Sequence, residues 1–345
     1  MVRRTSLFLA FVIFSCVMLC GLSGVALASF GFTELENTLI NEDGSPAVQA
    51  GSHPWAMVTN FNFAQAASGR PDESLKDITL NLPPGLVGNT GAVAKCALKD
   101  FLSIPDQTGI PHGSNYEIGD ENCPNDTQVG VAEVRTQPAS VESSFNFGLY
   151  NLEPPPGVPA EFGVNVAGIP IILQASVRTD SDNGISLTVR NASQELSFYG
   201  GRFTTWGTPQ DPSHDGERGL CLGLLGGSVG KCPLGSGVKP QAFLTLPTSC
   251  SSTFPVSQMH ANTWEHPTQT VPSESVPNKD AAGNALGILG CGALGFRPSL
   301  GISMDTTQAD SPAGLTAEVK VPQDGLIVSG GLGTATLEDT KVILP

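Results

Sequence analysis

Apolar and polar residues alternate in several short segments of the chain, and a period of two is typical of β-strands. In "SHPWAMVTNFNF" the alternate positions are Trp55, Met57, Thr59, Phe61 and Phe63, and all of them except Thr59 are large and apolar. The later segment "SLKDITLNLPPG" has apolar residues at Leu75, Ile78, Leu80 and Leu82. A Pro-Pro-Gly sequence then ends it. These two segments predict a pair of β-strands joined by a polar loop.

The clearest local pattern lies between residues 171 and 191. The segments "IILQASVRT" and "ISLTVRN" alternate on Leu173, Ala175 and Val177 and then on Ile185, Leu187 and Val189. They flank "DSDNG", where Asn183-Gly184 supplies residues that tolerate positive φ, so a β-hairpin is predicted. Asp180, Asp182 and Gly184 also suggest a calcium loop, but the Gly is one place early and no Glu occupies the twelfth position.

The remaining segments predict an all-β fold of β-sandwich-like modules with long Gly/Pro-rich loops, disulfides and one or two short helices. "AVAKCALKDFL" is the candidate helix, and residues 207–240 are expected to form a surface loop without periodicity. Residues 29–50 are predicted to be a flexible leader. We expect one β-rich, disulfide-stapled module over residues 51–308.

The amino terminus has the features of a secretory signal peptide. Arg3 and Arg4 precede the apolar stretch Leu7–Leu22, and Ala26-Leu27-Ala28 offers small residues for cleavage. We therefore predict a signal peptide over residues 1–28 and an exported mature protein. The alternative is that this segment is retained as a membrane anchor, and no later segment is apolar enough for a membrane span.

The charge of the chain restricts its partners. Lys and Arg number 17 against 32 Asp and Glu, and removal of Arg3 and Arg4 leaves 15 against 32, a net charge of −17. This acidity argues against nucleic acid, which is bound through neutralised phosphates, and against anionic lipid surfaces. The 40 Gly and 27 Pro are typical of an extracellular β-protein with long turns.

Six of the eight Cys remain after removal of the signal peptide. An even number of Cys in an exported protein predicts three disulfides. Spacing does not determine the pairing, and we favour the sequential set, Cys96–Cys123, Cys221–Cys232 and Cys250–Cys291. No C-x-x-C motif is present and none of these Cys has a His at metal-ligand spacing, which argues against a zinc site.

The end of the chain repeats features of its beginning. "GSHPWAMVTNFNFAQ" followed by "SLKDITLNLPPG" has a counterpart in "DSPAGLTAEVKVPQ" followed by "TLEDTKVILP". Leu75-Lys76-Asp77 matches Leu337-Glu338-Asp339, and Leu82-Pro83 matches Leu344-Pro345. Such repetition indicates arrayed β-modules. We therefore expect residues 309–345 to be the start of a second β-module that is truncated.

These motifs, together with "NLEPPPGVPAEFG", "TWGTPQDPSHD" and "FLTLPTSC", resemble a family of large exported bacterial proteins with repeated β-rich modules. The resemblance covers roughly residues 50–345. It implies export and a modular β architecture, and it transfers no catalytic or binding residue to this chain.

The stretch "TTWGTPQDPSHDGERG" at residues 204–219 is the first candidate for chemistry. Asp211, His214 and Asp215 place a His between carboxylates, a pattern compatible with a metal ligand or a general base. Asp-Pro-Ser and Asp-Gly are also strong turn formers. No nucleophile motif accompanies these residues, and a structural turn is the preferred interpretation.

Two further groups of residues are candidates for chemistry. "HANTWEHP" contains His260 and His266, which with His214, Asp211 and Asp215 make up the predicted metal site. Trp55, Trp206 and Trp264 could offer sugar-binding platforms, but each lies in or beside a predicted strand, so core packing is preferred.

The sequence thus predicts an exported, non-enzymatic surface or extracellular protein with a structural or adhesive role. Its expected partner is an extracellular protein or envelope component, and no cofactor is expected. The alternative is a secreted hydrolase or metal-binding enzyme that uses the Asp211-His214-Asp215 loop.

Overall fold

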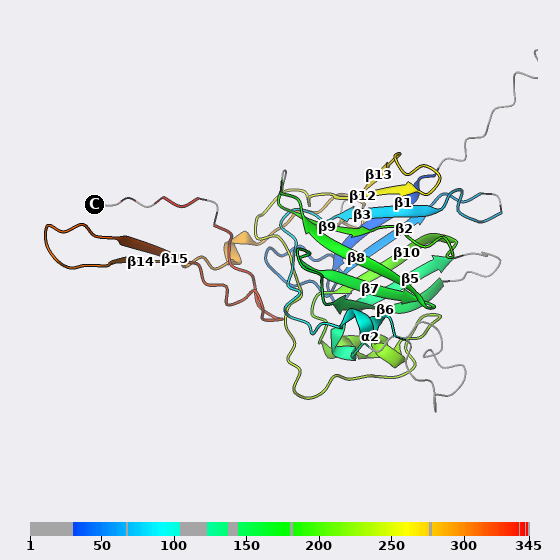
Figure 1. Cartoon of the computed structure of the whole chain (residues 1–345), viewed down its shortest axis with the longest axis horizontal. Coiled ribbons are helices and arrows are strands. Elements are labelled where there is room, and N and C mark those ends of the chain that lie inside the picture. The colour runs from blue at the N-terminus through cyan, green and yellow to red at the C-terminus, as the bar shows by residue number, and fades with distance from the viewer. Residues whose placement is uncertain are drawn as a thin grey trace, which may run out of the picture.

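The protein is described by a computed structural model that covers residues 30–66, 68–103, 123–136, 144–179, 182–275, 278–337, 339–341 and 343. The predicted signal peptide, Asp180, Glu338 and Leu344-Pro345 lie outside these residues. Figure 1 shows a broad sheet and a hairpin that projects from it. No helix in the described part of the chain is long and apolar enough to cross a membrane.

Eleven strands of the described residues form one antiparallel sheet. They are β1 (Phe32–Ile40), β2 (Ala56–Phe63), β3 (Leu75–Asn81), β5 (Gln128–Thr136), β6 (Ser144–Leu152), β7 (Glu161–Val166), β8 (Ile169–Val177), β9 (Ile185–Val189), β10 (Phe198–Trp206), β12 (Ser257–Thr263) and β13 (Val271–Ser275). Their order in the sheet is β1-β2-β10-β5-β6-β7-β8-β9-β3-β12-β13. The all-β prediction is confirmed.

The sheet curls so that its two edge strands, β1 and β13, come into contact (Figure 1). The N–H of Asn37 donates to Ser275 Oγ at 3.0 Å, and the N–H of Leu39 donates to Asn278 Oδ1 at 3.1 Å. Buried edge amides need such partners, because an unpaired N–H away from water is costly. We call this closed arrangement the rolled sheet. The two layers expected of a β-sandwich are here opposite parts of one curled sheet.

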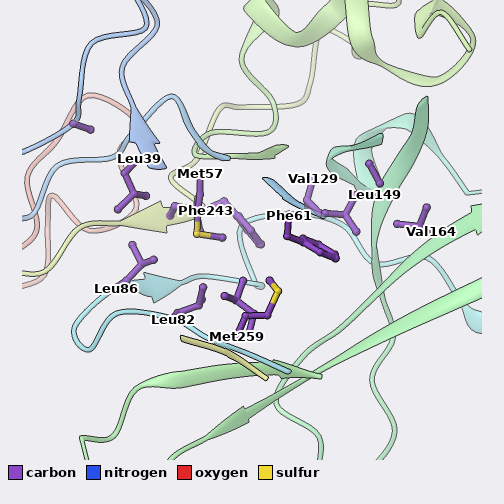
Figure 2. Close-up of a cluster of buried hydrophobic side chains, with 14 of the residues drawn as sticks. Leu39, Met57, Phe61, Leu82, Leu86, Val129, Leu149, Val164, Phe243 and Met259 are labelled. Atoms are coloured by element: carbon purple, nitrogen blue, oxygen red, sulfur yellow. The ribbon is translucent and has the colours of Figure 1, made fainter. Parts of the chain in front are cut away.

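The inner face of the rolled sheet carries the main apolar core. Met57, Phe61 and Phe63 lie in it, which confirms the alternation predicted for β2. Figure 2 shows side chains from distant parts of the chain, including Leu39, Leu149 and Met259, converging in this interior.

The prediction that residues 29–50 form a flexible leader is wrong for residues 32–40, because they form β1. β1 pairs with β2 along its length, from Phe32 opposite Phe63 to Ile40 opposite Ala56. Alternation of apolar and polar residues does not predict β1, because the polar Asn37 occupies an inward position. There its Nδ2 donates to Thr59 Oγ1 at 2.9 Å. Leu39 is fully buried beside it.

The hairpin predicted between residues 171 and 189 is confirmed as β8 and β9, which pair from Leu173 opposite Val189 to Val177 opposite Ile185. Asn183 adopts a positive φ of 53°. Gly184 does not have a positive φ, and a Cβ there would meet the end of the flexible Arg178 side chain.

Smaller elements complete the described fold. The candidate helix is confirmed in part, as the short α2 (Leu98–Phe101). The others are the strand pair β4 (Val87–Gly88) and β11 (Leu244–Thr245), the hairpin β14 (Ser299–Met304) and β15 (Leu315–Lys320), and the 3-10 turns η2 (Asn125–Thr127), η3 (Pro212–Glu217), η4 (Gly219–Cys221) and η5 (Cys291–Ala293).

The boundary predicted at residues 308 and 309 falls in the turn of the β14–β15 hairpin. After β15 the chain returns to the rolled sheet. The N–H of Ala242 donates to Ile327 O at 3.1 Å, and the N–H of Gly333 donates to Gly51 O at 2.7 Å. Residues assigned to a second module therefore also contact the first.

The predicted disulfides are confirmed in sequential order, Cys96–Cys123, Cys221–Cys232 and Cys250–Cys291. They close chain separations of 27, 11 and 41 residues. Because a cross-link restricts the unfolded chain more when its loop is longer, the third is expected to stabilise most.

Replacing both Cys of one disulfide by Ser should lower the free energy of unfolding, measured by urea denaturation. The expected loss is about 4 kcal/mol for Cys250 and Cys291, and about 3 kcal/mol for Cys221 and Cys232. The wild type with its disulfides reduced serves as the reference for loss of all three cross-links. Unchanged stability in either double variant would contradict the assignment.

Candidate functional site

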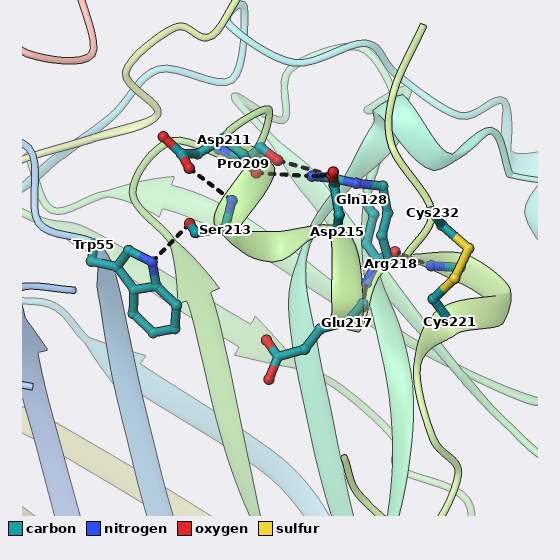
Figure 3. Close-up of polar contacts among 11 residues, drawn as sticks. Trp55, Gln128, Pro209, Asp211, Ser213, Asp215, Glu217, Arg218, Cys221 and Cys232 are labelled. Atoms are coloured by element: carbon teal, nitrogen blue, oxygen red, sulfur yellow. Dashed lines mark hydrogen bonds and ion pairs between the residues drawn. A yellow bond between two sulfur atoms is a disulfide. The ribbon is translucent and has the colours of Figure 1, made fainter. Parts of the chain in front are cut away.

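The stretch 204–219 forms a compact corner at the end of β10. Pro212 opens η3, and Asp211 precedes it as the capping residue, where its Oδ1 accepts a hydrogen bond from the N–H of Ser213 at 2.9 Å. Trp55 Nε1–H donates to Ser213 Oγ at 3.1 Å (Figure 3). This bonding of Asp211 to the backbone two residues on is the turn chemistry predicted from the sequence.

His214 is enclosed between two indole rings. Its ring centroid lies 4.9 Å from that of Trp55 and 4.4 Å from that of Trp206, and the residue is only 1% exposed. Neither ring nitrogen has a hydrogen-bond partner among the described residues. Burial lowers the pKa of His214 to about 3, assisted by the positive charge of Arg218 and opposed by Asp211. His214 is therefore a neutral packing residue and is not accessible to a substrate.

Arg218 is the polar centre of this corner. It is fully buried, and it donates to Pro209 O at 2.9 Å and to Asp211 O at 3.3 Å. A weaker contact joins it to Asp215 Oδ1 at 3.4 Å, and its guanidinium lies over the Trp206 ring. Burial lowers the pKa of Arg218 despite the nearby Asp215 carboxylate.

The corner also anchors the loop closed by the second disulfide. The backbone O of Asp215 accepts a hydrogen bond from the N–H of Cys232 at 2.9 Å. Gln128 Nε2–H donates to Glu217 O at 2.9 Å, which ties the corner to β5. The Glu217 carboxylate points away from the Arg218 guanidinium (Figure 3). These contacts describe a structural element and supply no exposed acid–base pair.

Three of the five residues of the predicted metal site, Asp211, His214 and Asp215, lie in or directly before η3, and the other two lie in or after β12. His214 is enclosed in η3, whereas His260 lies in the middle of β12, opposite Thr79 of β3. His266 follows β12, and its Nδ1 lies 2.9 Å from Glu73 Oε2. The described residues contain no group of three or more His, Cys, Asp or Glu side chains that could hold a metal ion.

The calcium loop considered at residues 180–184 has a different arrangement. Both carboxylate oxygens of Asp182 accept hydrogen bonds from Arg178, at 2.8 and 2.9 Å. These bonds, with one from the N–H of Gly184, lower the pKa of Asp182 to about 2. The charge of Asp182 is thus already balanced by Arg178, and Asp180 lies outside the described residues.

The three Trp do not form one binding platform. Trp206 is fully buried against Val131 and Leu222 on the outer face of the sheet, which confirms core packing for this residue. Trp264 is 38% exposed, so core packing is wrong for it. Its Nε1–H donates to Ala192 O at 3.0 Å, and the Lys76 ammonium lies over its ring.

The rolled sheet contains a feature that sequence reasoning missed. A cavity of about 320 Å³ lies in its interior, and its walls are almost wholly apolar. The residues that line it include Met57, Leu80, Leu173, Leu187, Phe203 and Met259. The alternation on β8 and β9 predicted that Leu173 and Leu187 face inward. It could not show that the interior is incompletely filled.

Comparison of the chain with known protein families, curated proteins and solved structures found no match. The geometry of the described residues is therefore the basis for a functional assignment.

The protein should become less stable as the pH is lowered from about 6.5 towards 3. The pKa of His214 is lower in the folded protein than its ordinary 6.5, so in this range the unfolded chain binds a proton that the folded protein does not. This one residue should reduce the free energy of unfolding by about 1.4 kcal/mol per pH unit. Urea denaturation at several pH values measures the slope.

His214→Phe should flatten this slope, because it keeps a ring between the two Trp rings and removes the titrating group. His266→Gln is the control, since His266 is exposed and paired with Glu73, and it should retain the slope of the wild type. An equal slope in wild type and His214→Phe would mean that folding does not lower the pKa of His214 and would contradict the prediction.

Proposed function

We propose that this is an exported, non-enzymatic protein with a structural or adhesive role at the cell surface or outside the cell, and that it self-associates through the β14–β15 hairpin. Three disulfides support export, because disulfides persist mainly in oxidising compartments. The hairpin projects from the rolled sheet (Figure 1), and the observation that carries the proposal is its exposed apolar face.

The register of the hairpin segregates its side chains completely. Leu300 pairs with Val319, Ile302 with Ala317 and Met304 with Leu315. Because side chains alternate between the two faces of a strand, these six residues share one face. The other face carries Ser299, Gly301, Ser303, Thr316, Glu318 and Lys320. All twelve residues are exposed, so an entire apolar face is uncovered.

Two-stranded hairpins are marginally stable in water, and apolar surface on an extended element marks an interaction site. The sequence repeat supports a β-type partner, since β15 lies in the counterpart of the segment that contains β2. In the rolled sheet the apolar face of β2 packs against other strands. A second copy of the hairpin can supply the equivalent cover.

Two features make a second copy a suitable occupant. A two-fold interface is formed by the same surface patch on both subunits, so the apolar face of one hairpin can pack against the same face of a second copy. The strands also carry no net charge, because Glu318 and Lys320 pair at 3.2 Å. The paired strands therefore add no repulsion of their own between two strongly acidic molecules, and the acidic groups of the hairpin, Asp305 and Asp310, lie in its turn.

The alternative hydrolase or metal-enzyme function depended on the Asp211-His214-Asp215 loop. The burial of His214 between Trp55 and Trp206 leaves that alternative without support from the described site.

Self-association is tested with matched substitutions on adjacent positions of β14. Ile302→Asp places a charge on the apolar face, whereas Ser303→Asp places the same charge on the polar face. The mature protein should form a dimer whose dissociation constant rises at least about tenfold in Ile302→Asp, since burial of one large apolar side chain contributes about 1.5–3 kcal/mol. Ser303→Asp should have little effect.

Sedimentation velocity over a range of protein concentrations gives the dissociation constants. Circular dichroism checks that both variants retain the fold of the rolled sheet. A wild type that is monomeric at every concentration, or equal weakening by both substitutions, would contradict the proposal.

A further inference from the structure

We propose that the interior of the rolled sheet binds a long apolar chain whose polar end carries no negative charge. This inference is independent of the hairpin, since it depends on cavities enclosed by other strands. It assigns a ligand-binding site to a region that the sequence indicated only as core.

A second cavity, of about 260 Å³, adjoins the first. Both cavities are lined by Phe61, Ile78, Val189 and Phe203. The rings of Phe61 and Phe203 are stacked, with their centroids 6.1 Å apart and their planes at 6°. The cavities are therefore neighbours that share a wall, and we expect rotation of these side chains to join them.

The two cavities follow one another along the strands. On β3, Leu75 lines the second cavity, Ile78 lines both, and Leu80 lines the first. On β8 the same order runs from Ile171 in the second cavity to Leu173 in the first. At about 3.3 Å per residue, the seven steps from Leu75 to Leu82 span roughly 23 Å. The available space is elongated, which suits an extended chain better than a compact ring system.

The first cavity has an apolar rim. Val87 and Val177, which both line it, are 46% and 48% exposed. Large apolar side chains half exposed at the rim of an apolar cavity provide an entrance that does not require a charged group to lose its hydration. The Ser and Thr residues of the lining are Thr59, Thr90, Ser176 and Thr205. The first cavity is therefore suited to a hydrocarbon chain.

The charged residues of the second cavity indicate which polar end group the ligand can carry. Its lining includes Asp72, Glu73 and Glu265 against a single base, Arg70. The whole mature chain is also strongly acidic. Like charges at a binding site oppose a ligand of the same sign. A carboxylate or phosphate end group is thus disfavoured, and a hydroxyl or an ammonium group is accepted.

Three probes with the same twelve-carbon chain test this inference. They are 1-dodecanol below its solubility limit, and dodecyltrimethylammonium and dodecanoate below the concentrations at which they form micelles. Isothermal titration calorimetry with the mature protein gives the affinities, and the melting temperature is an independent readout because a ligand that binds the folded state stabilises it. The first two probes should bind, and dodecanoate should bind at least tenfold more weakly.

Two neighbouring residues of β9 provide matched variants. Leu187 lines the first cavity, and the adjacent Thr188 lies on the opposite face, where its Oγ1 is 3.0 Å from Thr79 Oγ1. Leu187→Trp fills the cavity and should weaken binding of 1-dodecanol at least tenfold, whereas Thr188→Trp should leave it unchanged. Ala175→Leu is a milder filling variant if Leu187→Trp does not fold.

Several results would overturn the inference. They are the absence of binding by all three probes, equal binding by a folded filling variant and the wild type, and dodecanoate binding as tight as that of the other two probes. Sedimentation of the Leu187→Trp variant keeps the two proposals apart, since loss of probe binding should leave self-association through the hairpin unchanged.

Discussion

The rolled sheet exists because an antiparallel sheet with one apolar face must bury that face against something. Met57, Phe61 and Phe63 on β2 and Met259 on β12 all face the same interior. In the described residues this face is covered by the sheet itself, with loop residues such as Leu86 and Phe243 filling in from the ends. Closure then requires partners for the backbone of the outermost strands. Ser275 and Asn278 provide them to β1.

The number of strands determines what closure leaves inside. Rolled sheets of about eight strands are just wide enough for their own side chains to fill the interior, and wider ones enclose space. Eleven strands exceed that width. This accounts for inward residues such as Ile78, Leu173 and Leu187, which pack against the core and are only partly buried. The cavity thus follows from strand number, and no special local sequence produces it.

Strand β10 connects the cavity to the corner on the outer face. Phe203 and Thr205 line the cavity, whereas Trp206 at the end of the same strand packs outward on His214. The buried Arg218 fixes this corner by bonding to the backbone of residues 209 and 211. A rigid outer corner therefore supports one wall of an incompletely filled interior. The acidic and His residues that suggested chemistry contribute to this support.

Local patterns in the sequence predicted local structure well. Alternation identified β2 and the β8–β9 hairpin, and the order of the six Cys matched their pairing. The sequence-based predictions were wrong or incomplete where the environment of a residue is formed by parts of the chain far away in the sequence. Asn37 interrupts the apolar face of β1 but bonds to Thr59 on the next strand. His214 looked reactive beside two Asp, but Trp55, more than 150 residues away, covers it. The cavity depends on the order of strands across the sheet, which alternation within single strands does not contain.

The projecting hairpin also has one apolar face, but that face is not buried as the apolar face of the rolled sheet is. Leu300, Ile302 and Met304 alternate as the inward residues of β2 do, yet no described strand lies over them. A sheet of two strands is too narrow to curl over its own face. The cover must therefore come from outside the hairpin, and the absence of net charge on its strands permits that cover to be another copy of an acidic chain. The physical requirement that closes the body of this protein thus supports the proposal that its projecting hairpin associates with a second copy.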